Sequence, residues 1–170
     1  LEGGDANRFQ RYGLRADTLG EEIVRTYRLA VGGMETLAEH GMPRAWLSSD
    51  GVFLDSASAW YPDFGGEPFT FEMYVAAPPG WQIISQDRGV QRPDGTFVWT
   101  VDQPQQETYL LGGPYSRYAE MHGDTQLVVY LLGPDEELAQ RYLGVMGQYL
   151  DFFSELLGEY PYRQFAVVEN

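Results

Sequence analysis

The sequence predicts a mainly β fold with an α/β extension: an antiparallel β-sandwich, then one long helix and a strand. Short apolar runs separated by Gly, Pro and Asp turns recur from residue 45 to residue 132. Helical spacing then runs from Pro134 to Leu157. A short apolar and partly β-branched run, Phe165 to Val168, follows a Tyr-Pro-Tyr turn. The pattern divides near Gly133 into a sandwich part, residues 44–132, and an α/β part, residues 133–170.

Residues 1–43 form a lead-in that we expect to be irregular and partly helical. The segment EEIVRTYRLA has helical spacing, and Gly32-Gly33 interrupts it before METLAEH resumes. One broken helix and one long loop fit this pattern equally well.

The clearest strand signal in the sandwich part is Phe69 to Val75. Its period of two places Phe69, Phe71, Met73 and Val75 on one face, as in a half-buried strand. The other expected strands are AWL, GVFL, WQIIS, TFVWTV, ETYLLG, YSRYAEM and TQLVVYLL.

The helix is expected to begin at Pro134, because proline suits the first helical position and three acidic residues follow it. Gly158 is the expected C-cap. The expected apolar stripe consists of Leu138, Tyr142, Tyr149, Phe153 and Leu156 or Leu157, widened by Leu143, Met146 and Leu150. Since the chain ends in a strand beside this helix, we expect the natural protein to continue.

The charge of the chain excludes some classes of partner. It has 25 acidic and 11 basic residues, a net charge of −14, and every basic residue is Arg. Such a surface repels phosphate backbones and anionic lipid, so we expect no nucleic-acid binding. No apolar run approaches the roughly 18 residues of a membrane span, so no membrane insertion is expected. The absence of Cys excludes disulfides and thiolate metal sites.

The residue types that carry chemistry form no convincing active site. His40 and His122 both lie in turn-like segments without a second ligand at zinc-site spacing. The carboxylates Asp55, Asp63 and Glu67 flank an aromatic cluster, but no pair stands out. We therefore predict no catalytic residue and no metal ligand in these 170 residues.

Five segments, in order, resemble the zinc aminopeptidase family of aminopeptidase N and leukotriene A-four hydrolase, especially its divergent bacterial members. LDSASAWYP and EPFTFEMYV resemble segments of the family's N-terminal β domain, and ISQDRG resembles a turn that follows one of its strands. TVDQPQQETYLLGGPYSRY resembles its Pro-x-x-x-x-Tyr-Leu-x-x-Gly-x-Tyr segment. LLGEYPYRQFAVVEN resembles the strand that opens the thermolysin-like catalytic domain.

The resemblance also has departures. Glu169-Asn170 lacks the Gly and Met of the family's Gly-x-Met-Glu-Asn loop, and the His-Glu-x-x-His zinc motif would lie beyond residue 170. The family's substrate-lining Gln has no clear counterpart. Its position would fall near Leu54 to Ser56, which makes Asp55 and Ser56 the candidates for a substrate cleft.

The resemblance implies a non-catalytic segment that roofs the cleft of a zinc metallopeptidase, where peptides are cleaved from the amino end. Zinc and peptide substrate are then expected only of the full-length protein. Two alternatives stay open: a β-sandwich binding or scaffolding module with Trp60-Tyr61 at its ligand face, and an acidic glycosidase accessory domain. A further hypothesis is a homodimer through the helix residues Tyr142, Met146, Tyr149 and Phe153.

Overall fold

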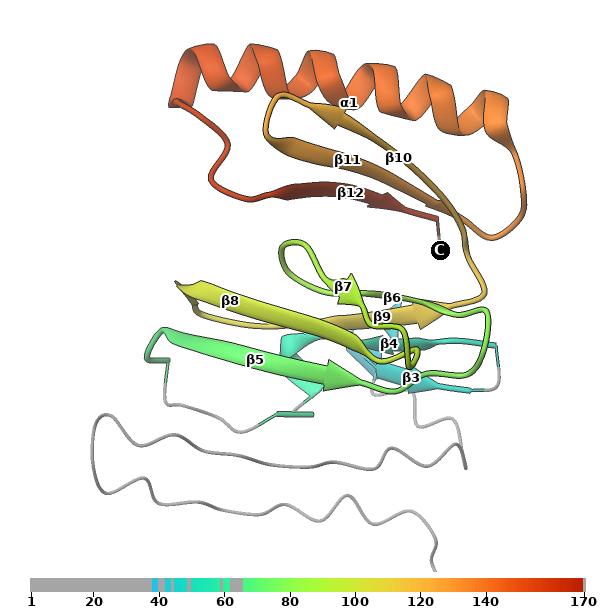
Figure 1. Cartoon of the computed structure of the whole chain (residues 1–170). Coiled ribbons are helices and arrows are strands. Elements are labelled where there is room, and N and C mark those ends of the chain that lie inside the picture. Colours follow the sequence, from blue (N-terminus) through green and yellow to red (C-terminus); the bar gives the residue numbers. More distant parts are fainter. Residues whose placement is uncertain are drawn as a thin grey trace, which may run out of the picture.

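The computed structural model describes residues 38–39, 42–43, 45–48, 50–58, 60–61 and 66–169. Helix α1 (Glu136–Leu157) covers one face of a small sheet, and the other face of that sheet lies over a β-sandwich (Figure 1). This arrangement confirms the predicted fold class, a sandwich followed by a helix and a strand.

The sandwich has a four-stranded sheet in the order β3-β4-β9-β6 and a three-stranded sheet in the order β5-β8-β7. The first contains β3 (Ala45–Leu47), β4 (Val52–Leu54), β9 (Leu110–Gly113) and β6 (Gln82–Ile84). The second contains β5 (Phe69–Val75), β8 (Phe97–Gln105) and β7 (Val90–Gln91). All neighbours within these two sheets are antiparallel, as predicted.

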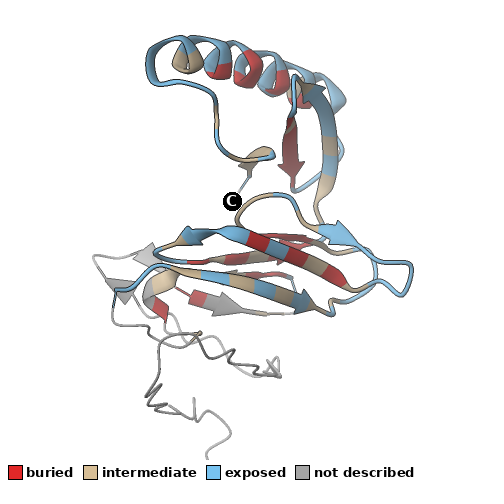
Figure 2. Ribbon diagram, turned by 60° about the vertical axis from the view of Figure 1, so that its left-hand side comes forward, coloured by how far each residue is buried: buried red, intermediate tan, exposed pale blue. Residues whose placement is uncertain are grey.

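The core of the sandwich forms between the inner faces of its two sheets. Exposure alternates along β5, and Phe71, Met73 and Val75 pack against the core, which confirms the predicted period of two. Trp99 of β8 is 2% exposed and stacks on Phe97, with 6.2 Å between the ring centroids. Figure 2 shows buried and non-buried residues alternating along the strands of the sandwich.

A second, mixed sheet has the order β10-β11-β12. The strands β10 (Ser116–His122) and β11 (Thr125–Leu131) are antiparallel, whereas β11 and β12 (Gln164–Val168) are parallel and α1 connects them. Hydrogen bonding therefore joins strands on both sides of the division expected near Gly133. The domain boundary itself stays a prediction.

The central strand of this sheet, β11, is covered on both faces, which explains its nearly continuous apolar sequence. Leu127, Val129 and Leu131 pack beneath α1. Val128 and Tyr130 point the other way and form a cluster with Ile84 of the sandwich. Two clusters therefore hold the sheet: one attaches the helix and the other attaches the sandwich.

Helix α1 differs from the expectation at its start and in its buried face. Asp135 is the N-cap, and its Oδ1 accepts a hydrogen bond from the Leu138 N–H at 2.9 Å, so Pro134 precedes the helix instead of opening it. Gly158 is the C-cap, as predicted. The buried residues are Ala139, Leu143, Met146, Gly147 and Leu150.

Leu143, Met146 and Leu150 are buried, as predicted, but Ala139 and Gly147 complete the buried face in place of the aromatic residues, because small residues permit close packing. Tyr142 and Tyr149 are largely exposed, and Met146 is 3% exposed because the sheet covers it. Met146 cannot contribute to an external face in this fold. The homodimer through the helix stays a prediction that rests on the remaining aromatic residues.

Within the lead-in, β1 (Ala38–Glu39) and β2 (Met42–Pro43) form a short antiparallel pair where a helix or loop was expected. A Gly between two short segments favours such reversals. The helical spacing of residues 21–31 lies outside the described residues. No helix among the described residues combines the length and the hydropathy needed to cross a bilayer.

Candidate functional site

The two predicted cleft residues, Asp55 and Ser56, lie at the corner where β4 ends and a short 3-10 helix, η1 (Ser56–Ser58), begins. The backbone carbonyl of Asp55 accepts hydrogen bonds from the Ser58 N–H at 3.2 Å and from the Ser58 hydroxyl at 2.7 Å. These two bonds close the turn, so the backbone of Asp55 is fixed relative to β4.

The side chain of Ser56 connects this corner to the segment before β9. Its hydroxyl donates to Oε2 of Glu107 at 2.7 Å. Asp55 and Glu107 are therefore two carboxylates held near one turn, 52 positions apart in the sequence (107 − 55). We call Asp55, Ser56 and Glu107 the acidic corner.

One oxygen of the Asp55 carboxylate, Oδ1, is buried and has no hydrogen-bond partner among the described residues. A buried carboxylate oxygen without a donor is unfavourable by roughly 1–3 kcal/mol. The acidic corner can accept hydrogen bonds from a cationic or amine group.

The acidic corner offers no nucleophile for covalent catalysis. The Ser56 hydroxyl donates to the exposed carboxylate of Glu107. Among the described residues, no histidine lies beside Ser56 to act as a base. Activation of a serine in hydrolases normally requires an adjacent base such as His. The carboxylates of this corner supply hydrogen-bond acceptors.

Sequence reasoning missed the residue that supports this corner from behind, Gln86. Its Nε2 donates to the Glu107 carbonyl at 2.6 Å, and its Oε1 accepts from the Thr108 hydroxyl at 2.6 Å and from the Tyr109 N–H at 3.2 Å. These partners lie 21 to 23 positions away in the chain. Only strand pairing brings them together, so no local signal in the sequence could have identified Gln86.

The aromatic residues beside the corner are used in packing. Trp60 packs against the sandwich core and meets Tyr61 edge to face, with 5.3 Å between centroids and 78° between ring planes. The Tyr61 hydroxyl accepts from the Thr108 N–H at 3.3 Å. Two rings at right angles do not form the flat platform on which a sugar ring stacks.

Only one of the two histidines, His122, lies among the described residues. His40 lies outside the described residues. His122 is the last residue of β10, not a turn residue as expected, and its Nε2 lies 2.7 Å from Oδ1 of Asp151 on α1. Among the described residues, no group of three or more His, Cys, Asp or Glu could hold a metal ion.

A hollow of about 210 Å³ lies elsewhere, between the open edge of the sandwich and the mixed sheet. Neither Asp55 nor Ser56 lines it. The predicted cleft residues and the hollow are thus separate features of the molecule.

Comparison with known proteins gives similarity in fold. No family model matches the sequence, and no curated protein matches it. Among solved structures, the chain is similar to an aminopeptidase N family protein from Idiomarina loihiensis, with a TM-score of 0.51 and 18% sequence identity. The match covers 72% of this chain and 22% of the other, so the chain spans about a fifth of that protein's length.

Proposed function

We propose that this chain is a non-catalytic segment of a zinc-dependent aminopeptidase-like metallopeptidase, in which it roofs the cleft where peptides are cleaved from the amino end. One observation carries the proposal. The chain is similar in fold to part of an aminopeptidase N family protein, with a TM-score of 0.51 over 72% of the chain. The order of sequence segments that resemble this family supports the same conclusion.

A cleft roof must keep a fixed position, and the junction in this chain is suited to that role. The cluster of Ile84, Val128 and Tyr130 fills the space between the sandwich and the mixed sheet. Arg163, just before β12, donates to both carboxylate oxygens of Asp87 in the β6–β7 connection. Apolar packing and a charged clamp together resist relative movement of the two parts.

The acidic corner is the part of this roof to which we assign substrate contact. The carboxylate of Asp55, a half-buried residue, would accept a hydrogen bond from the protonated amino group of a peptide. Ser56 would act as a positioning residue, because it holds Glu107 beside the corner. The net charge of −14 favours the approach of a cationic group.

Zinc does not fit the donor set of the described residues, since three metal-ligating side chains nowhere come together. The resemblance to the family implies that the His-Glu-x-x-His motif lies beyond residue 170, and we therefore assign no catalytic step to this chain. In the proposed enzyme the metal would belong to residues outside positions 1–170.

The test compares the 170-residue chain with the full natural protein. We expect the chain alone to bind no stoichiometric zinc and to leave aminoacyl anilides intact. The full protein should hydrolyse them and lose this activity to a zinc chelator. An inactive, fully zinc-supplemented natural protein would overturn the proposal, as would amidase activity of the chain alone.

The role of Asp55 needs its own variant of the full protein. Asp55→Asn should raise KM for aminoacyl anilides about tenfold with little change in kcat, because it weakens binding of the amino group. Asp124→Asn, in the exposed β10–β11 turn, is the matched control and should leave KM unchanged. Equal effects of the two substitutions would contradict the assignment of Asp55.

A further inference from the structure

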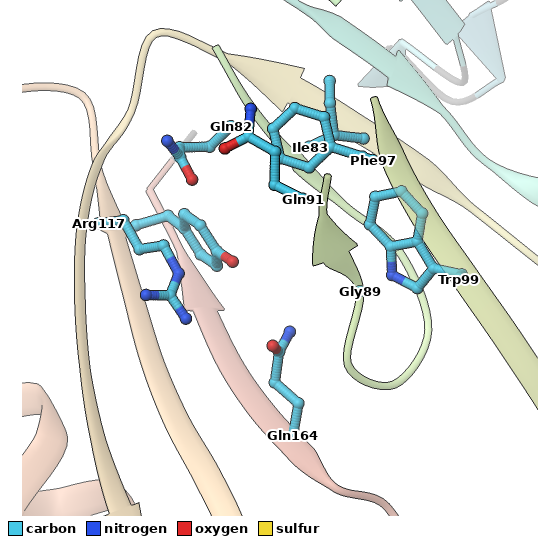
Figure 3. A pocket seen from close by; sticks show the side chains of 9 residues that line it. Gln82, Ile83, Gly89, Gln91, Phe97, Trp99, Arg117 and Gln164 are labelled. Atoms are coloured by element: carbon cyan, nitrogen blue, oxygen red, sulfur yellow. The ribbon is translucent and has the colours of Figure 1, made fainter. Parts of the chain in front are cut away.

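The hollow between the sandwich and the mixed sheet has the features of a binding site. The two sandwich sheets end in the edge strands β6 and β7, and the space between these edges stays open. Gln82 and Gln91 line it from the edges, and Arg117 and Gln164 line it from the mixed sheet (Figure 3). Its volume of about 210 Å³ would hold several water molecules or one small polar ligand.

Trp99 lines the hollow and is 2% exposed. Its indole Nε1 is a hydrogen-bond donor that has no partner among the described residues. Figure 3 shows the indole nitrogen on the side of the ring that faces the hollow. An indole N–H can only donate, so its partner must be an acceptor.

The backbone at Gly89 packs directly against the indole beside the hollow. A Cβ at Gly89 would lie 2.3 Å from Cε2 and 2.7 Å from Nε1 of Trp99. Any side chain at this position would displace the ring or fill the space beside its nitrogen. The close approach of backbone to indole thus preserves the hollow.

The charge of the lining is opposite to that of the whole protein. No carboxylate lines the hollow, although the chain has 25 acidic residues. Arg117 forms no ion pair with a described carboxylate; its guanidinium donates to the neutral Oε1 of Gln126 at 3.0 Å. Burial raises the pKa of Tyr130, so its hydroxyl stays protonated in this lining.

We propose that this hollow binds a small oxyanion-bearing molecule, a carboxylate or a phosphate, through the Arg117 guanidinium and the Trp99 indole N–H. A guanidinium and an indole are both donors without acceptor capacity, and an oxyanion satisfies both. The glutamine amides supply further hydrogen bonds for the rest of the ligand. This inference does not rest on the proposed peptidase function.

Bound in this place, the ligand would touch strands of both parts of the molecule. Trp99 and Gln91 belong to the sandwich, whereas Arg117 and Gln164 belong to the mixed sheet. Binding would therefore stabilise the position of the sandwich relative to the sheet, as expected for any ligand that binds only the folded junction.

The experiment is an NMR titration of the ¹⁵N-labelled 170-residue chain, followed through the indole N–H signals. Inorganic phosphate and sodium acetate are the two probes, and sodium chloride at matched ionic strength is the control. The Trp99 signal, assigned by its absence in Trp99→Phe, should shift saturably with a Kd on the order of 1 mM for at least one probe. The probe that binds more tightly identifies the class of oxyanion.

Variants distinguish the site from general anion effects. Arg117→Gln should weaken binding about tenfold, because it removes the one cationic group of the lining. Arg141→Gln, on an exposed position of α1, changes the net charge equally and should leave Kd unchanged. Far-UV circular dichroism of each variant verifies that it is folded.

Three outcomes would overturn the proposal. One is the absence of a saturable Trp99 shift with both probes, which would mean that water alone fills the hollow. Another is an equal shift with sodium chloride. The third is equal weakening by Arg117→Gln and Arg141→Gln, which would trace the binding to net charge.

Discussion

The clamp between Asp87 and Arg163 offers a sharp test of how the sandwich is joined to the mixed sheet. Oδ1 of Asp87 accepts from the Arg163 backbone N–H at 2.9 Å, and Oδ2 accepts from Nε at 3.0 Å and from an Nη at 2.8 Å. Asp87 has φ +58°, in the left-handed region that Asn also tolerates. Asp87→Asn therefore removes the charge and keeps the backbone conformation.

The magnitude follows from the two bonds at Oδ2. In Asn an NH₂ group takes the place of one oxygen, so either it faces the guanidinium donors or the bond to the Arg163 N–H is lost. Hydrogen bonds to charged groups contribute roughly 1.5–3 kcal/mol each when buried. The Asp87 side chain is 12% exposed but that of Arg163 is 62% exposed, so solvent screens the pair. We expect Asp87→Asn to lower the free energy of unfolding by about 1–2 kcal/mol in total.

The chain provides separate probes for the two parts during urea unfolding. All four Trp residues precede β9, so Trp fluorescence reports on the sandwich side. Helix α1 follows β11, so circular dichroism at 222 nm reports mainly on the mixed-sheet side. If the clamp couples the parts, the two transitions coincide in the wild type and separate in Asp87→Asn.

Two further variants establish the cause. Asp124→Asn removes an exposed carboxylate from the β10–β11 turn and should change stability by less than about 0.5 kcal/mol. Arg163→Lys keeps the charge but loses the forked geometry, so it should recover only part of the clamp. A change below about 0.5 kcal/mol in Asp87→Asn, or one equal to that of Asp124→Asn, would refute the reasoning.

Three other predictions concern stability. Desolvation raises the pKa of Tyr160 to about 12. The unfolded phenol ionises near pH 10, so stability falls from there towards pH 12, and Tyr160→Phe should reduce that fall by up to about 1 kcal/mol in alkaline urea titrations. Gly89→Ala should destabilise by about 1–3 kcal/mol and shift the emission of buried Trp99, since the new Cβ clashes with the indole. Asp135→Ala should destabilise by about 1 kcal/mol through loss of the cap to Leu138, measured by thermal melting.

The parts of the fold that the sequence predicts well are those governed by local periodicity. The alternation along β5 is visible in the sequence at Phe71, Met73 and Val75, because one face of that strand packs on the core and the other is exposed. The cap at Gly158 follows from its positive φ, which favours glycine. Where one residue's neighbours in sequence decide its conformation, the prediction succeeds.

The helix face was harder to predict because apolar residues surround much of α1. Aromatic side chains at Tyr142 and Tyr149 suggested a buried stripe, yet Ala139 and Gly147 lie at the contact. A Cβ at Gly147 would lie 3.2 Å from Nδ1 of His122, so the small residue permits the helix to approach the hairpin end. A pattern of hydrophobic residues does not show that a glycine permits such close packing.

The sequence offered Asp55 and Ser56 as candidates but not Glu107, and the reason for this also applies to the hollow. Asp55 and Ser56 are neighbours in sequence, but Glu107, which completes the corner, comes from the segment before β9. The two donors of the hollow also come from separate elements: Trp99 lies on β8 and Arg117 on β10, in different sheets. The local sequence around each residue gives no sign of a binding site, since it predicts a core position for the Trp and a surface position for the Arg. Their chemistry arises when the mixed sheet lies across the open edge of the sandwich, and we expect the clamp of Asp87 and Arg163, 76 positions apart, to contribute to that placement. Loosening the clamp should therefore weaken anion binding even though Asp87 does not line the hollow.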